Sequence, residues 1–113
     1  MRHESLYLTD IIEAADFIAE FISDSDFDGF EKSEIMRSAV VQKLMTIGEA
    51  AGRVSEDLRS NHPEIPWSQI VAFRNILIHA YFGIEWEIVW NAAVYRCPEL
   101  RKQISAILDE GAR

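Results

Sequence analysis

Four side chains suited to acid–base or ionic chemistry lie close together in the segment RNILIHAY. Arg74 is the only formal charge in residues 65–84, and Asn75, His79 and Tyr81 follow it at short intervals. A guanidinium pairs with carboxylate or phosphate oxygens through a planar fork of N–H groups, and an imidazole can donate or accept a proton near neutral pH. These residue types predict either an ion pair or a site that acts on an anionic group.

Helical geometry limits how these side chains can cooperate. Successive residues rotate by about 100°, so Asn75 and His79 share one face at i, i+4 and Arg74 shares another with Tyr81 at i, i+7. Arg74 and His79 therefore diverge by about 140° on an ideal helix. They can meet only if the helix unwinds near Gly83 or if two copies of the helix face each other. We expect a site at a helix end or in a homodimer.

A structural explanation for Arg74 stands beside the functional one. A buried arginine needs a partner, a water-filled cleft or an interface, because an unpaired charge is costly to bury. Glu49, in the otherwise small and apolar segment IGEAA, is the candidate partner in a structural ion pair. Composition and spacing leave both explanations open.

His79 is expected in the last turn of its helix, where the negative end of the helix dipole favours an imidazolium and so a general acid. The alternative is a hydrogen-bonded interior histidine. His3 and His62 stand at no metal-ligand spacing relative to it, and the chain has no HExxH or CxxC motif. We therefore expect neither a metal ion nor another cofactor.

The elements that must position these residues are helices. Apolar residues recur at helical spacing, and no segment alternates like a strand. The expected long helices cover residues 6–22, 33–54, 66–81 and 84–108, the last interrupted or restarted near Pro98. Gly83 is the expected stop of the third helix, and Gly48 inside the second indicates close packing against another backbone. The pattern predicts an all-α, up-and-down bundle of four to five helices.

Length and charge set further bounds. The 113 residues, 49% of them apolar, predict one domain spanning residues 1–113. A net charge of −8 argues against a protein that grips nucleic acid by neutralising phosphates over a broad face. A single cysteine, Cys97, and no signal-like N-terminus predict a cytoplasmic protein, and the polar residues within 65–84 argue against a membrane span.

Several motifs in a fixed order resemble one family. RNILIHAY matches Arg-x4-His-x-Tyr with Asn after the Arg, and it is preceded by IGEAAGRVS and PEIPWSQIVAF and followed by FGIEWEIVW and PEL. This order resembles the HepT-like toxins of the HEPN superfamily, small all-α proteins encoded beside a minimal nucleotidyltransferase antitoxin, MntA. The resemblance covers nearly the whole chain.

The resemblance implies a HEPN-like bundle acting as a metal-independent endoribonuclease toxin in a type VII-like toxin–antitoxin pair. It implies a homodimer, an RNA substrate and an MntA-like nucleotidyltransferase partner. Arg74 and His79 would be the catalytic pair where two protomers meet, with Asn75 supporting them, and Tyr81 would be the residue that the antitoxin adenylylates. As the candidate partner of Arg74, Glu49 is expected to be a second supporting residue. Cleavage of RNA without a metal needs a group that moves a proton and a cation that stabilises the phosphate, and these two side chains supply both.

An alternative function belongs to a different class of protein. The chain could be a non-catalytic helical subunit that binds nucleotide or presents Tyr81 to a nucleotidyltransferase partner. The acidic net charge favours this alternative, whereas the presence of both Arg74 and His79 favours the enzyme.

Overall fold

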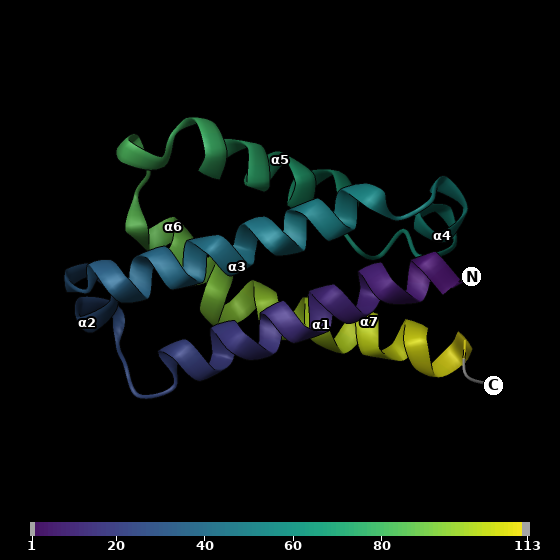
Figure 1. Cartoon of the computed structure of the whole chain (residues 1–113), viewed down its shortest axis with the longest axis horizontal. Helices are drawn as coiled ribbons and strands as arrows, with labels where there is room; N and C mark the ends of the chain where they lie inside the picture. The colour runs from purple at the N-terminus through teal and green to yellow at the C-terminus, as the bar shows by residue number, and fades with distance from the viewer. Residues whose placement is uncertain (1, 112–113) are drawn as a thin grey trace.

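Four long helices run alternately up and down the molecule in the computed structural model (Figure 1), which describes residues 2–111 and the side chains of 4–111. They are α1 (Arg2–Ile22), α3 (Glu34–Arg53), α5 (Trp67–His79) and a last helix made of α6 (Trp86–Asn91), η2 (Ala92–Arg96) and α7 (Cys97–Gly111). The described residues contain no strand. The prediction of an all-α, up-and-down bundle is confirmed.

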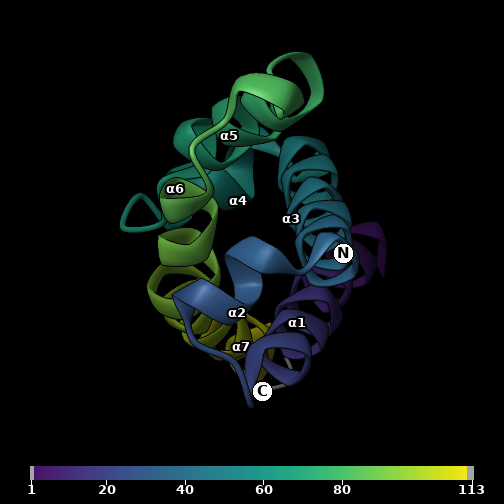
Figure 2. The same cartoon turned by 90° about the vertical axis from the view of Figure 1, so that its left-hand side faces the viewer.

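The helices form an open arrangement rather than a closed square. α1 packs against both α3 and α7, whereas α5 packs mainly on α3. An end-on view shows α5 at the top of the molecule, α3 and α1 along the right-hand side, α7 at the bottom and α6 on the left (Figure 2). Because α5 packs mainly on α3, the position of RNILIHAY depends on how these two helices cross.

Most of the residues expected in the core are buried, since the periodic apolar stripes face the other helices. In α1 the buried members of the expected stripe are Leu8, Ile11, Ala15 and Ile18. Apolar spacing predicts either Ile35 or Met36 on the stripe of α3, and Met36 packs against the core while Ile35 is 85% exposed. Ile88, expected on the stripe of the last helix, is 50% exposed, so that prediction is wrong. Both exposed residues lie in the first turn of a helix, at its outer side.

Two short helices occupy segments expected to be turns or polar ends. α2 (Phe27–Lys32) forms because Asp26 accepts a hydrogen bond from the Gly29 amide and because Phe30 is fully buried. α4 (Glu56–Asn61) begins at Ser55, whose hydroxyl accepts a hydrogen bond from the Leu58 amide. Each short helix provides hydrogen bonds for the backbone of a connection between two long helices.

The third long helix ends two residues before the expected position. It stops at His79, and Tyr81–Gly83 continue as a 3₁₀ turn, η1, in which the Gly83 amide donates to the Ala80 carbonyl at 2.9 Å. Pro66 lies just before the first helical residue, one position from the expected start. The turn containing Tyr81 is therefore tighter than the helix that carries Arg74 and His79.

The interruption expected near Pro98 takes the form of a π-helical turn in the last helix. The turn spans Ala92–Arg96, the Cys97 amide donates to the Ala92 carbonyl, and α7 starts at Cys97. A proline clashes with the carbonyl four residues before it and has no N–H to donate, and a widened turn relieves this conflict. None of the helices in the described range is both long and apolar enough to cross a lipid bilayer.

Candidate active site

Arg74 sits where α3 and α5 approach most closely. A Cβ added to Gly48 would lie 2.3 Å from the Arg74 Cβ and 2.6 Å from its Cγ, so only glycine leaves room for this side chain. The guanidinium then reaches the next residue of α3, where its Nη1 donates to the Glu49 Oε1 at 2.7 Å. The close packing expected at Gly48 and the expected ion pair with Glu49 are both present.

The ion pair uses only part of the guanidinium. The Arg74 Nε is buried and has no hydrogen-bond acceptor among the described residues. The Arg74 side chain is 23% exposed and the Glu49 side chain 51%, so the pair lies at the edge of the core rather than within it. Ion pairs with this much exposure contribute less than about 1 kcal/mol to stability. Glu49 therefore orients Arg74 at the surface without sequestering it from an incoming anion.

Asn75 and His79 face away from the α3 contact. Both side chains are exposed, and α5 keeps its helical geometry through His79. Arg74, in contrast, is partly buried against α3. The divergence of Arg74 from His79 expected on an ideal helix is thus retained within one chain. A site that uses both side chains must draw on more than this arrangement of a single protomer.

Tyr81 is held by a series of ring contacts. Its ring meets the Trp86 ring edge-on at 5.6 Å and the Phe82 ring edge-on at 5.4 Å. The Arg37 guanidinium lies 5.0 Å from the centre of the Trp86 ring. Neither Arg37 nor Phe82 was among the site residues predicted from the sequence. The one available signal for Phe82 was an aromatic side chain placed at the expected helix end.

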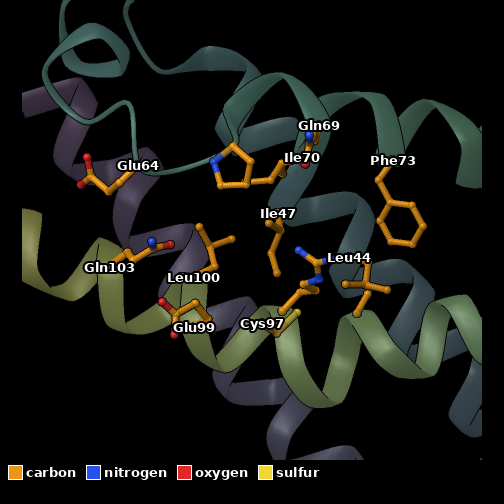
Figure 3. A pocket seen from close by; sticks show the side chains of 13 residues that line it. Leu44, Ile47, Glu64, Gln69, Ile70, Phe73, Cys97, Glu99, Leu100 and Gln103 are labelled. Carbon is orange, nitrogen blue, oxygen red and sulfur yellow. The ribbon is translucent and has the colours of Figure 1, made fainter.

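A groove lies on another side of α5, between that helix and α7 (Figure 3). Its volume is about 340 Å³, and its walls combine apolar side chains such as Ile70 and Phe73 with polar ones such as Gln69 and Gln103. Arg74, Asn75, His79 and Tyr81 are absent from its lining. The motif residues therefore lie outside this groove, on the other faces of α5.

Cys97 borders the groove but lacks the features of a reactive thiol. It is 4% exposed, and burial raises the pKa of its thiol to about 12. A protonated thiol is a poor nucleophile and a poor metal ligand. Among the described side chains, which exclude His3, no three His, Cys, Asp or Glu residues are grouped to hold a metal ion.

Comparison with known proteins identifies a family. Residues 11–107 match the family model described as "Ribonuclease HepT-like". The chain is 36% identical over 106 residues to "Putative RNase MJ1380" of Methanocaldococcus jannaschii, covering 94% of this chain and 97% of that protein. It is 38% identical over 100 residues to "Probable ribonuclease HepT" of Thermococcus cleftensis, covering 88% and 91%. No solved structure gave a significant match. The chain belongs to the HepT-like ribonuclease family.

Proposed function

We propose that this HepT-like ribonuclease cuts RNA internally without a metal ion, at a site built by Arg74 and His79 of two facing protomers. The main support for this proposal is the orientation and partial exposure of the Arg74 guanidinium. It is oriented by Glu49 at 2.7 Å yet remains partly exposed, on the helix that also presents His79 to solvent. Gly48 leaves room for the stem of this side chain where α5 crosses α3.

The proposed chemistry divides the work between the two side chains. The RNA 2′-hydroxyl attacks the adjacent phosphorus, and the bond from phosphorus to the 5′-oxygen breaks. His79 transfers a proton in this exchange, and Arg74 stabilises the negative charge on the non-bridging oxygens. Asn75 contributes a further hydrogen-bonding group beside them. The products are a 2′,3′-cyclic phosphate and a free 5′-hydroxyl.

A homodimer would bring Arg74 and His79, which diverge within one chain, close to each other. The outer part of α5 carries two half-exposed apolar side chains, Ile76 at 50% and Ile78 at 43%, next to Asn75 and His79. Apolar side chains beside polar functional groups suit an isologous contact, in which the same surface of each copy meets the other. Such a contact would bring His79 of one protomer toward Arg74 of its partner.

Mixing two inactive variants tests this arrangement. In a mixed dimer of Arg74→Ala and His79→Ala subunits, one of the two composite sites retains both wild-type residues. We expect each variant alone to be inactive and the refolded mixture to recover about a quarter of the wild-type rate, because about half of the dimers are mixed. A mixture as inactive as its components would contradict a site shared between protomers.

The same site offers a means of control. We propose that the protein is a cytoplasmic toxin of a HEPN/MNT pair and that an MntA-like nucleotidyltransferase transfers AMP to Tyr81. The tyrosine is partly exposed in the turn immediately after His79. A phosphodiester there adds a negative charge and a bulky base, which would compete with RNA for the cationic site.

The net charge of −8 favours a second candidate function. A non-catalytic subunit that binds nucleotide or a nucleotidyltransferase partner has no need of a positive surface for RNA. Expression of the chain alone separates the two functions. The enzyme arrests growth and cleaves RNA in a manner that requires His79, whereas the binding subunit does neither.

A further inference from the structure

Phe82 is the most exposed of the large apolar side chains in the described part of the chain, with a relative exposure of 101%. A single exposed apolar residue is common on protein surfaces and by itself indicates nothing. What sets Phe82 apart is its position, three residues after His79 in the turn that ends α5. An aromatic face is thus displayed three residues after the proposed catalytic group, in the turn that follows its helix.

The turn that carries Phe82 is packed at its base, while the Phe82 ring itself is fully exposed. The ring meets Tyr81 edge-on at 5.4 Å, and Tyr81 meets Trp86 edge-on at 5.6 Å. Trp86 is in turn packed against the core and covered by Arg37. The backbone of the turn is closed by the hydrogen bond from the Gly83 amide to the Ala80 carbonyl. These contacts fix the turn that carries Phe82, so the ring is presented at a defined place on the surface with its faces open to a ligand.

The turn that carries Phe82 is open to solvent. His79, Ala80 and Glu85 are all exposed, and a Cβ added to Gly83 would meet no atom beyond its chain neighbours within 4 Å. His79 and Glu85 are polar and Ala80 is small, whereas the exposed apolar side chains Ile76 and Ile78 lie on the preceding turns of α5, in the surface proposed above for the dimer contact. A flat ligand with an apolar face and polar edges fits the surface around Phe82 better than an apolar protein segment does.

We propose that Phe82 is a stacking platform for an unpaired RNA base next to the scissile phosphate, an inference that rests on the proposed ribonuclease function. Every base has a π-face, so stacking on an aromatic side chain binds single-stranded RNA with little dependence on sequence. It also needs no positive charge, which suits a chain whose net charge is −8. Holding one base would fix the ribose whose 2′-hydroxyl attacks.

Fluorescence tests the platform separately from catalysis. The probe is a single-stranded RNA carrying 2-aminopurine at one position at a time, bound to full-length His79→Ala protein so that no cleavage occurs. We expect quenching at one position, kept in Phe82→Trp and Phe82→Tyr and lost in Phe82→Leu. Affinity should fall about tenfold in the leucine variant, since stacking on one aromatic ring typically accounts for a change of that order.

Matched variants in the cleaving protein complete the test. Phe82→Leu keeps an apolar side chain but removes the π-face, so kcat/KM should fall about tenfold while the oligomeric state stays unchanged. Cleavage that is unchanged in Phe82→Leu would overturn the platform. A changed oligomeric state of this variant would also overturn it, because it would show that Phe82 makes a protein contact. Phe82-dependent quenching without cleavage by the wild type would keep the platform and remove the catalytic proposal. Absence of any RNA binding would overturn both.

Discussion

The Arg74 Cβ occupies the position that a side chain on Gly48 would need, with only 2.3 Å between the two Cβ positions. The same crossing brings the Arg74 Nη1 within 2.7 Å of the Glu49 carboxylate. Close packing of α3 on α5 and orientation of the guanidinium are therefore two results of one contact. A change that separates the helices should disturb both the stability of the fold and the chemistry of Arg74.

Replacing Gly48 by alanine tests this link. Overpacking of a close contact typically costs about 1–3 kcal/mol, which exceeds the gain of about 1 kcal/mol from removing a glycine within a helix. We expect Gly48→Ala to lower the urea midpoint and to reduce RNA cleavage. Gly52→Ala is the control, because its Cβ would meet only the Val71 Cγ2 at an ordinary 3.7 Å. Equal stability of the two variants would contradict the tight crossing.

Substitution of the two proposed catalytic residues should separate activity from folding. His79→Ala is expected to reduce RNA cleavage by about two to four orders of magnitude, the usual effect of removing an acid–base group. Arg74→Ala is expected to reduce it by about two to three orders of magnitude, the usual effect of removing a group that stabilises charge in the transition state. Circular dichroism should remain that of the wild type. Arg74→Lys keeps the charge but loses the planar fork, so it should recover only part of the rate. Activity that disappears on addition of EDTA would contradict a mechanism without metal.

Adenylylation should be confined to Tyr81. The measurement is incubation with the cognate nucleotidyltransferase and ATP, followed by mapping of added AMP by mass spectrometry. Tyr81→Phe should stay unmodified and should keep its ribonuclease activity in the presence of the nucleotidyltransferase. Tyr95, which is 68% exposed, is the internal control for accessibility alone. Modification at Tyr95 or Tyr7 in place of Tyr81 would refute the assignment.

The buried thiol of Cys97 should make stability depend on alkaline pH. Burial raises the pKa of this thiol from 9.0 to about 12, so between these values the unfolded chain loses a proton that the folded chain keeps. The unfolded state then binds fewer protons, and stability falls as pH rises through this window, by up to about 1.4 kcal/mol per pH unit. Below pH 9 the thiol is protonated in both the folded and the unfolded chain, so the stability associated with this group is fully present.

Cys97→Ala provides the comparison for this effect. The variant should be somewhat less stable at neutral pH because a small cavity forms, yet its stability should decline less steeply between pH 9 and 10. Other groups titrate in the same range, so the informative quantity is the difference between the two slopes in urea unfolding. Identical slopes would show that the thiol titrates alike in both states.

Local patterns allowed the four long helices and the type of site residues to be predicted from the sequence. Apolar spacing marked α1, α3, α5 and the last helix, because each buries one continuous stripe. Their ends were less accurate where hydrogen bonding was not evident from residue type, as in the 3₁₀ turn of Tyr81–Gly83 and the π turn before Pro98. The motif RNILIHAY and the acid in IGEAA named the residues of the ion pair before their geometry was known.

Only the tertiary structure decided how those residues are arranged. Glu49 and Arg74 are 25 positions apart, and their contact depends on the crossing of α3 with α5. The buried Glu4 carboxylate likewise accepts a hydrogen bond from the Ser55 hydroxyl at 2.6 Å, 51 positions away. The exposure of Phe82 also follows from packing, since a local pattern cannot tell which side of a turn another helix will cover. Sequence periodicity determines which face of a helix is buried, whereas the packing of whole helices determines which distant residues meet.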